Sequence, residues 1–326
     1  MHPLSTAVLI FSLCGGDDGE QPRIEADGRV TLAGDLAYPS QLSGLAVYRG
    51  MLVACPDEGT ALNVLAPAGH DRYQALSVVS LSEGDAEIDM EGLTCDGDAL
   101  FVIGSHSRAR KKIEETRSYQ RNRERLEEIK DERSRHCIVR FELDRRGHCS
   151  RRDQVSLRKI LKKDAILGAF TALPSKENGI DIEGIAAVDG KLYLGFRGPV
   201  LRGNYVPVMV LRYNAPAQYE LMFLNLGGRG IRDLTAYAGG LLVLAGPVGD
   251  GVGSYELYCW NCQDCLPGRG GPQGRIRHIG TLESPGNAKP EGMAVVEERA
   301  NELTLLLVSD GIEAPVAERV RVRLPR

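Results

Sequence analysis

The sequence is poor in the residues that several common enzyme sites require. It has six His and one Trp among 326 residues, and aromatic residues make up only 6%. No two His stand at zinc-ligand spacing, which argues against a catalytic zinc. The motifs Gly-x-Ser-x-Gly, His-Glu-x-x-His and the phosphate-binding P-loop are absent, as is a local Cys–His nucleophile signature. The sequence therefore disfavours these common hydrolase classes.

Long apolar runs and a strong excess of one charge are also missing. No segment approaches the roughly 18 apolar residues of a membrane helix, so we expect no membrane span. The net charge of −4 gives no bias toward nucleic acid, and we expect a monomer that binds none. The apolar stretch 7–13 is short, and no Lys or Arg precedes it as in a secretory signal. We predict an opening β-strand there and a cytoplasmic protein, with export through a degenerate signal or lipid anchor as the alternative.

The eight cysteines are too few for a disulfide scaffold in a chain of this length. Cys259, Cys262 and Cys265 form two overlapping Cys-x-x-Cys steps at the start of a Cys/Gly-rich loop, residues 259–274. Zinc needs four ligands, and His278 is the nearest fourth. A metal site, a disulfide or redox pair, and an incidental cluster all remain open for this loop.

What the chain does contain is 38 Gly, 43% hydrophobic residues and one short pattern written five times. Each copy has a polar or charged residue, Gly or a substitute, an apolar run, a tight turn and a second apolar run. The Gly position falls at residues 44, 92, 184, 233 and 292, so most intervals lie near 50 residues. The long second interval contains residues 107–135, which carry eleven basic and seven acidic residues without Gly or Pro. Such a segment is typical of an exposed helix.

A hairpin repeated at a fixed period predicts an all-β fold, a β-propeller with one four-stranded blade per repeat. We expect one domain over residues 1–326, with a helical insertion at 107–135. A strand at Arg29–Leu32 would complete the last blade and close the ring. Five blades are favoured, and an extra strand near residues 7–11 would allow six. Further outer strands are expected at Ile138–Leu143, Pro207–Tyr213 and Val320–Leu324.

The residues that begin the first strand of each repeat are mostly acidic. In a propeller this strand lines the central channel, so these side chains should meet. Like charges about 4 Å apart cost on the order of 4 kcal/mol per pair at an effective dielectric of 20. The set comprises Ser43, Glu91, Glu183, Arg232 and Glu291, with Asp89 and Asp181 two residues earlier in two copies and Asp233 at the Gly position of the fourth.

Three interpretations of this acidic ring remain open. Arg232 could neutralise it in a purely structural ring, or one carboxyl could be protonated and catalytic. A divalent cation, Ca²⁺ or Mg²⁺, could instead balance the charge, because both ions prefer hard oxygen ligands. Its candidate ligands are Ser43, Asp89, Glu91, Glu183 and Glu291.

The residues that follow the second strand of each repeat should lie on the same face. Arg197 and Arg202 flank a Gly/Pro-rich turn, an arrangement that suits carboxylate or phosphate. With Asp181 and with His106 as a general acid or base, they form the candidate catalytic set. The insertion leaves from this face and could be a lid or a solvated arm. The candidate ligand-binding residues are Arg108, Lys111, Arg232, Asp233 and Asp310.

Four segments in order, IDMEGLTCDGDALFVIGSHSRARKK, GIDIEGIAAVDGKLYLGFRGPVLRG, NLGGRGIRDLTAYAGGLLVLAGP and KPEGMAV, resemble the bacterial family called domain of unknown function 3616. The likeness spans roughly residues 28–310 and implies a β-propeller without an established activity. A more distant likeness is to calcium-dependent apyrases, five-bladed propellers whose central cation is held by Ser and Glu of successive blades. Esterase-like phytase propellers share the repeated Glu-Gly strand starts. Arg232 departs from the apyrase ring.

These observations support two main functions. The first is metal-assisted hydrolysis of an anionic ester, in particular a phosphoester, on the channel face. The second is a non-catalytic propeller that binds an anionic small molecule or a protein partner. A third interpretation is a ring whose acids only fix the packing of the blades.

Overall fold

The computed structural model describes residues 21–81, 87–144, 146–283, 288–311 and 315–324. The strand expected near residues 7–11 and the weak N-terminal signal lie outside these ranges. Within them, strands dominate and helices are few, which confirms the prediction of a mainly β fold. The helical elements are α1 (Tyr119–Glu127), α2 (Arg158–Lys163) and three short 3₁₀ turns, η1 (Arg133–Arg135), η2 (Leu167–Phe170) and η3 (Ser175–Glu177).

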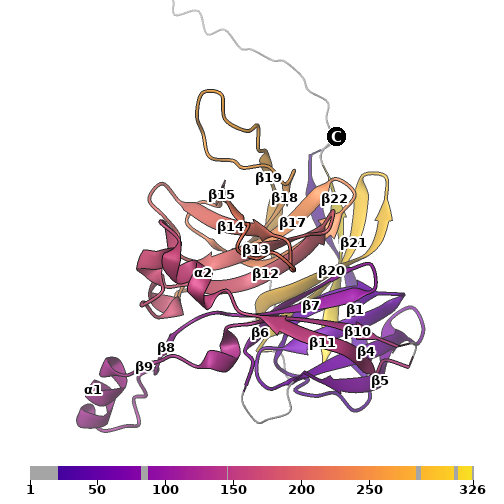
Figure 1. The fold of residues 1–326 in the computed structure, drawn as a ribbon. Helices are drawn as coiled ribbons and strands as arrows, with labels where there is room; N and C mark the ends of the chain where they lie inside the picture. Colours follow the sequence, from indigo (N-terminus) through magenta and orange to yellow (C-terminus); the bar gives the residue numbers. More distant parts are fainter. Residues whose placement is uncertain (1–20, 82–86, 145, 284–287, 312–314, 325–326) are drawn as a thin grey trace, which may run out of the picture.

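Three sheets of four strands are each built from consecutive or nearly consecutive strands (Figure 1). Antiparallel pairing joins all neighbours within them. In hydrogen-bonded order they are β11 (Cys149–Val155), β10 (Ile138–Leu143), β7 (Ala99–Gly104) and β6 (Met90–Asp96); β12 (Asp181–Val188), β13 (Lys191–Gly198), β14 (Tyr205–Leu211) and β15 (Glu220–Asn225); and β16 (Gly230–Tyr237), β17 (Gly240–Gly246), β18 (Tyr255–Trp260) and β19 (Ile276–Leu282).

An eight-stranded sheet combines the two ends of the chain. Its central strand β1 pairs antiparallel with β22 and parallel with β5, the latter through residues 31–33 and 72–74. β1 therefore holds the first four-stranded group and the last one together. The order is β2 (Leu42–Tyr48), β3 (Met51–Pro56), β4 (Ala61–Pro67), β5 (Arg72–Ser80), β1 (Arg23–Ala33), β22 (Val316–Arg323), β21 (Glu302–Asp310) and β20 (Lys289–Arg299).

The first strands of the five repeats contact one another in a cycle. β2 packs on β6, β6 on β12, β12 on β16, β16 on β20, and β20 returns to β2. Figure 1 shows β6, β12 and β20 converging near the centre of the molecule. Since these strands form a closed circuit, side chains at their starts face a shared central space. This arrangement is propeller-like.

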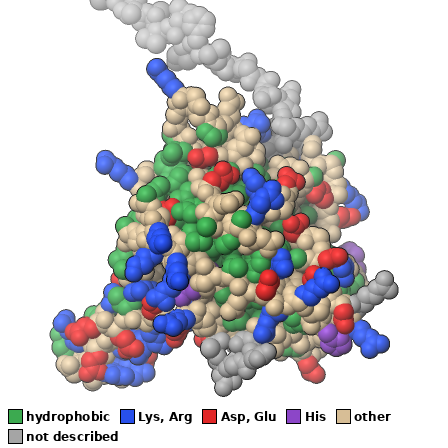
Figure 2. All heavy atoms as spheres, in the orientation of Figure 1, with side chains coloured by type: hydrophobic (Ala, Val, Ile, Leu, Met, Phe, Trp, Pro, Cys, Tyr) green, Lys and Arg blue, Asp and Glu red, His purple; other side chains and the backbone are tan. Residues whose placement is uncertain are grey.

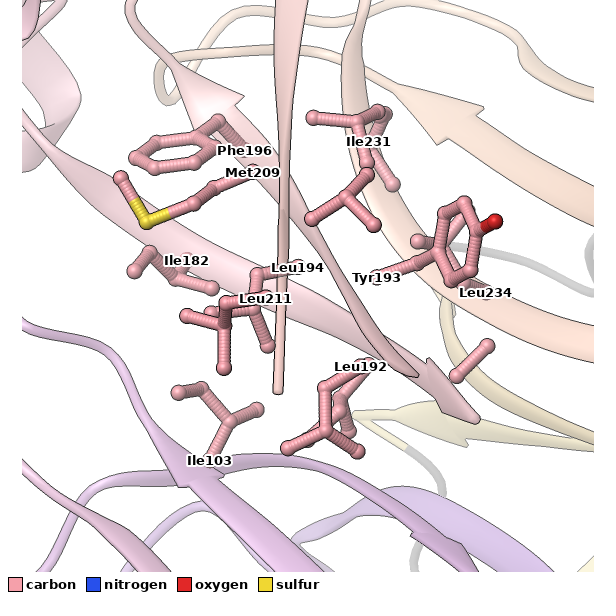
Figure 3. Packing of buried hydrophobic residues seen from close by; sticks show 14 of the residues in the cluster. Ile103, Ile182, Leu192, Tyr193, Leu194, Phe196, Met209, Leu211, Ile231 and Leu234 are labelled. Atoms are coloured by element: carbon pink, nitrogen blue, oxygen red, sulfur yellow. The ribbon is translucent and has the colours of Figure 1, made fainter. Parts of the chain in front are cut away.

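The core lies between the sheets, where apolar faces of neighbouring repeats meet. Its largest described cluster packs β12, β13 and β14 against β7 on one side and β16 on the other. Figure 3 shows Ile103 of β7 below Leu192 and Leu211, and Ile231 with Leu234 of β16 beside Tyr193. Alternate residues of each strand point to opposite faces, so one strand serves two such interfaces.

The segment 107–135 is an arm rather than one long helix. The expected helical insertion contains one exposed helix that fills only part of it: α1 occupies nine residues and is carried on a two-stranded ribbon of β8 (Ala109–Arg110) and β9 (Ile129–Lys130) (Figure 1). Ser118 caps α1 by accepting a hydrogen bond from the Arg121 N–H. No residue of α1 is buried. Tertiary packing therefore does not stabilise a longer helix in this segment.

Two remaining features concern membranes and cysteines. None of the helices in the described ranges combines the length and apolar character needed to cross a bilayer. Cys259, Cys262 and Cys265 are free thiols, and the only three-residue metal-ligand group found among the described residues lies elsewhere. The loop instead packs on β15, where the Asp264 carboxylate accepts from the Phe223 N–H at 2.8 Å.

Candidate functional site

A one-residue β-bulge stands near the start of the first strand in all five repeats. In β6, for example, Met90 pairs with Gly104 and Gly92 with Ile103, which leaves Glu91 as the extra residue. A bulge changes the direction of the extra side chain relative to the sheet. The bulged residues are Ser43, Glu91, Glu183, Arg232 and Glu291. The repeat predicted their shared position, and the bulge supplies its physical cause.

The glycine after the bulge lets neighbouring first strands approach closely. A Cβ on Gly92 would lie 2.5 Å from the Glu183 carbonyl oxygen, and one on Gly292 would lie 2.7 Å from the Ser43 carbonyl oxygen. The fourth repeat has Asp233 instead. Its carboxylate accepts from the N–H groups of Leu234 and Met293, at 2.8 and 2.7 Å, and so ties β16 to β20.

Arg232 forms the neutralising centre of one side of the ring. Its guanidinium pairs with Glu183 at 3.0 Å and also with Glu291. Arg197, from the end of β13, pairs with Glu183 at 2.8 Å and with Asp181. The carboxylates of β12 and β20 are therefore held by two guanidiniums that are themselves largely buried.

Glu91, which lies beside Asp181 and Glu183, is less well balanced. One oxygen each from Glu91, Asp181 and Glu183 lies within 4.8 Å of the others, a grouping that could hold a metal ion. No hydrogen bond or ion pair to the Glu91 carboxylate is found among the described residues. Burial, followed by the charges of Glu183, Asp89 and Asp181, raises the pKa of Glu91 well above its ordinary value. Removing the proton from Glu91 is therefore costly unless a cation arrives.

Neighbouring acids respond to the same environment. Burial raises the pKa of Glu183 to about 8, although Arg197 and Arg232 oppose the shift. Burial raises the pKa of Asp89 to about 6, although the positive charge of Arg135, 3.1 Å away, opposes this shift. Burial and the charge of Glu291 raise the pKa of Asp57 to about 7. The site thus contains several carboxyls whose pKa is raised toward neutral pH.

These groups line a cavity of about 500 Å³. Its lining carries eight acidic and six basic side chains, hence a formal charge of −2 when all are ionised. One divalent cation would balance that charge. The acids are Asp57, Asp89, Glu91, Asp181, Glu183, Asp250, Glu291 and Asp310; the bases are Lys112, Arg135, Lys176, Arg197, Arg232 and Lys289.

Several residues selected from the sequence are placed outside the cavity lining. Ser43 is buried and donates its hydroxyl to the Met90 carbonyl at 2.5 Å. Arg202 is exposed on the turn after β13. Asp233 is buried at the β16–β20 contact described above.

Three more candidates lie on or beside the arm, away from the acidic group. The His106 Nδ1 faces the Gly104 carbonyl at 2.8 Å, and its Nε2 accepts from the Leu157 N–H at 3.2 Å. Burial lowers the pKa of His106 to about 3, so this imidazole is neutral. Arg108 pairs with Asp131 at 2.9 Å, and Lys111 pairs with Glu128. Asp310 does line the cavity, 3.6 Å from Lys289.

The structure adds residues that the repeat does not reveal. Arg135 closes the arm and contacts Asp89, while Lys176 and Asp250 pair at 2.7 Å on the cavity wall. Tyr255 of β18 also contributes to the lining. These residues come from 3₁₀ turns, a loop and an outer strand, where no repeated motif marks their positions.

Comparison with known proteins identifies the family. Residues 41–323 match the model described as "Protein of unknown function (DUF3616)". The chain belongs to this family. Because the match covers most of the sequence, the resemblance of its four segments is confirmed. A search of curated proteins finds no match.

Similar solved structures are distant. Myxococcus xanthus glutaminyl cyclase shares 12% identity over 93% of this chain and 97% of its own, with a TM-score of 0.49. The WD40 domain of Toxoplasma gondii coronin shares 11% sequence identity, covers 94% of this chain and 87% of its own, and has a TM-score of 0.37. Pseudomonas aeruginosa periplasmic gluconolactonase shares 15% sequence identity, covers 85% of this chain and 67% of its own, and also has a TM-score of 0.37. At such values the likenesses say nothing about function, and the propeller-like description rests on the strand pairing.

Proposed function

We propose that this DUF3616 protein is a five-bladed β-propeller that binds a divalent cation in its channel cavity and hydrolyses an anionic phosphoester there. The blade count follows from dividing the eight-stranded sheet at the parallel β1–β5 pair, which gives four strands to every repeat. The observation that carries the function is the Glu91–Asp181–Glu183 group beside a cavity of about 500 Å³.

The residues present fit such an ion. Three carboxylates offer hard oxygen donors, as Ca²⁺ and Mg²⁺ require. Asp181 and Glu183 are fixed by Arg197 and Arg232, whereas no partner of Glu91 is found among the described residues. A bound divalent ion would supply Lewis-acid activation of water and of the phosphoryl group. It would also relieve the repulsion that raises the pKa of Glu91.

The anion would be attracted by lysines at the wall rather than by the ring arginines. Arg197 and Arg232 are engaged with carboxylates, so they hold the ligand set in place. Lys112, Lys176 and Lys289 line the cavity with exposed side chains that can reorient toward a ligand. Their ammonium groups suit phosphate oxygens as point charges.

Asp57 is the best-placed group for proton transfer. It lines the cavity, and its pKa of about 7 matches a general acid or base at neutral pH. One of its oxygens accepts from the Glu58 N–H at 2.8 Å, which orients the carboxyl and leaves the other oxygen to exchange a proton. His106, neutral and bonded through both nitrogens, is less suited to this role.

A phosphatase screen tests the proposal. Phosphomonoesters and nucleotides are incubated with Ca²⁺, Mg²⁺ or Mn²⁺, and phosphate release is measured. We expect Asp57→Asn to lose at least about 100-fold in kcat, as general acid–base groups typically contribute. Glu91→Gln should lose the metal-dependent turnover, because it removes a ligand of the proposed ion. Asp96→Asn, an exposed acid outside the cavity, should match wild type. No metal-dependent turnover by wild type, or full activity in Glu91→Gln, would sink the hydrolase.

The second candidate is non-catalytic binding of an anionic ligand. The engagement of Arg197 and Arg232 with Asp181, Glu183 and Glu291 favours it, because neither guanidinium is free to stabilise a developing charge. It predicts ligand-dependent thermal stabilisation without product formation in the same screen.

A further inference from the structure

A second cavity lies outside the channel, where the arm returns to β10. Its volume is about 740 Å³. It is bounded by η1 and the start of β10, by the end of β11 and by α2. Its lining consists of Leu81, Ile88, Arg133, Ser134, His136, Cys137, Gln154, Ser156, Arg158, Lys159 and Lys162. We call this space the α2 cleft.

The charged side chains that line the α2 cleft, among those that the structure describes, are basic. Four cationic side chains line it, and the lining contains no acidic residue among those that the structure describes. No ion pair to Arg133, Lys159 or Lys162 is found within the described ranges. In Figure 2, Lys and Arg side chains gather over α2 beside the root of the arm, with a histidine among them. This concentration of unbalanced positive charge differs from the mixed charges of the channel.

One acidic residue close to the cleft, Asp131, already has several basic partners. Asp131 pairs with Arg108 at 2.9 Å, with Arg158, and with the His136 Nε2 at 2.9 Å. A single carboxylate therefore faces two guanidiniums and an imidazole, so it cannot neutralise the lysines as well. The local excess of cations remains after every contact of Asp131 is counted.

A buried histidine lies at the wall of the cleft. His136 is 7% exposed and lines both the α2 cleft and a smaller neighbouring cavity of about 140 Å³. Its Nδ1 is buried, and no hydrogen-bond partner for it is found among the residues that the structure describes. Burial and the charge of Arg158 lower the pKa of His136, while its bond to Asp131 opposes the shift.

We propose that the α2 cleft binds an organic phosphate of about the size of a nucleotide. Arg133, Lys159 and Lys162 would hold the phosphate groups, since guanidinium forks and ammonium groups both suit phosphate oxygens. Arg158 is paired with Asp131 and would contribute mainly through its charge. Leu81 and Ile88 form an apolar wall that suits an uncharged ring or chain. The volume exceeds what inorganic phosphate alone would fill. This site is independent of the channel and needs no metal ion.

Titration calorimetry with ATP, AMP, adenosine and inorganic phosphate in EDTA tests the proposal. EDTA removes divalent ions, so the channel site does not contribute. We expect ATP to bind more tightly than AMP, AMP more tightly than inorganic phosphate, and adenosine to give no measurable heat. Affinity for ATP should fall as salt is raised from 50 to 200 mM because the contacts are charged. Equal binding of adenosine and ATP, or no binding of ATP, overturns the proposal.

Paired variants on one helix provide the control. The double variant Lys159→Glu/Lys162→Glu should weaken ATP binding at least about tenfold, a change of 1.4 kcal/mol. Lys163→Glu changes an exposed lysine of α2 that is outside the cleft, and should bind within about twofold of wild type. If Lys163→Glu weakens ATP binding as much as Lys159→Glu alone does, ATP is attracted by the general surface charge of α2, and the proposed site is wrong. Lys159→Gln/Lys162→Gln serves if the double reversal does not fold.

Discussion

Arg232 occupies a bulge position that is Ser or Glu in the other four repeats, and the chemistry of the channel depends on it. Its guanidinium lies between Glu183 and Glu291 and pairs with both. Attraction within a buried pair only offsets the cost of desolvating it, so the arrangement is sensitive to the loss of one partner. Arg232 balances carboxylates of β12 and β20, while no ion-pair partner of Glu91 is found among the residues that the structure describes.

Replacing Arg232 with Met should lower the free energy of unfolding by about 3–5 kcal/mol at pH 8, because two buried carboxylates lose their shared cation. At pH 5 the loss should be smaller, since Glu183, whose pKa is raised to about 8, is then protonated. Urea denaturation at both pH values measures the difference. Glu183→Gln in the Arg232→Met background should recover part of the stability. An equal loss at both pH values would contradict the charge-based explanation.

Glu91 should make the metal-free protein less stable as the pH rises. Its pKa is higher in the folded protein than its ordinary 4.5, so the folded state holds the proton that the unfolded chain releases. The free energy of unfolding therefore falls from about pH 4.5 upward, and Glu183 extends the fall to about pH 8. Glu91→Gln should flatten this slope and raise Tm at pH 8 in EDTA. Asp96→Asn is the control. If Glu91→Gln leaves Tm unchanged, ionised Glu91 does not destabilise the folded protein, and the explanation is wrong.

The sequence marked Glu91, Glu183, Arg232 and Glu291 because their place in the repeat is regular. It could not assign their partners, since the pairing of Arg197 with Asp181 and Glu183 depends on how two strands end. The neutral state of His106 likewise follows from burial and from a Leu157 N–H that is distant in sequence. The ion-pair partners and protonation states of these side chains therefore depend on tertiary contacts.

At the scale of elements, the bulge and the glycine after it act as one unit. The bulge turns a side chain to the channel, and the missing Cβ lets the next strand come close. The repeated hairpins predicted the first two strands of each repeat well, and β10 occupies the expected residues Ile138–Leu143. α2 was not expected, because six residues carry too little periodicity to reveal a helix.

Gly92→Ala tests this unit. The new methyl group would stand 2.5 Å from the Glu183 carbonyl oxygen, a backbone atom that cannot move aside. We expect a loss of about 1–3 kcal/mol in the free energy of unfolding, the usual cost of overpacking. Gly268→Ala, which has open space around it, should leave stability within about 0.5 kcal/mol. Chemical denaturation of both variants decides, and equal stabilities would mean that the strands do not need this close approach.

At the scale of the whole molecule, β1 joins the first four-stranded group to the last one, and the first strands form a closed circuit. A ring closed in this way should unfold as one unit, since opening one junction removes neighbours from both sides. The composition and the repeat period predicted the mainly β architecture. The path of the arm could not be predicted, because its charged residues are compatible with either a helix or a ribbon.

Val30→Asp places a charge on a β1 residue that is 1% exposed. We expect a loss of at least about 3 kcal/mol, because an unpaired charge is buried at the junction. Calorimetry should still show one transition at a lower Tm. Thr31→Asp, at an exposed position of the same strand, should melt near wild type. Two separate transitions in Val30→Asp would mean that the ring is not a cooperative unit.

The central claim is that the group of Glu91, Asp181 and Glu183 binds a divalent cation. The most direct measurement is equilibrium dialysis of purified protein against Ca²⁺, Mg²⁺ or Mn²⁺, followed by elemental analysis of wild type, Glu91→Gln and Asp96→Asn. We expect about one ion per chain in wild type and Asp96→Asn and none in Glu91→Gln, because Glu91 joins Asp181 and Glu183 in the ligand group. No bound ion in wild type, or the same ion content in Glu91→Gln, would contradict the account.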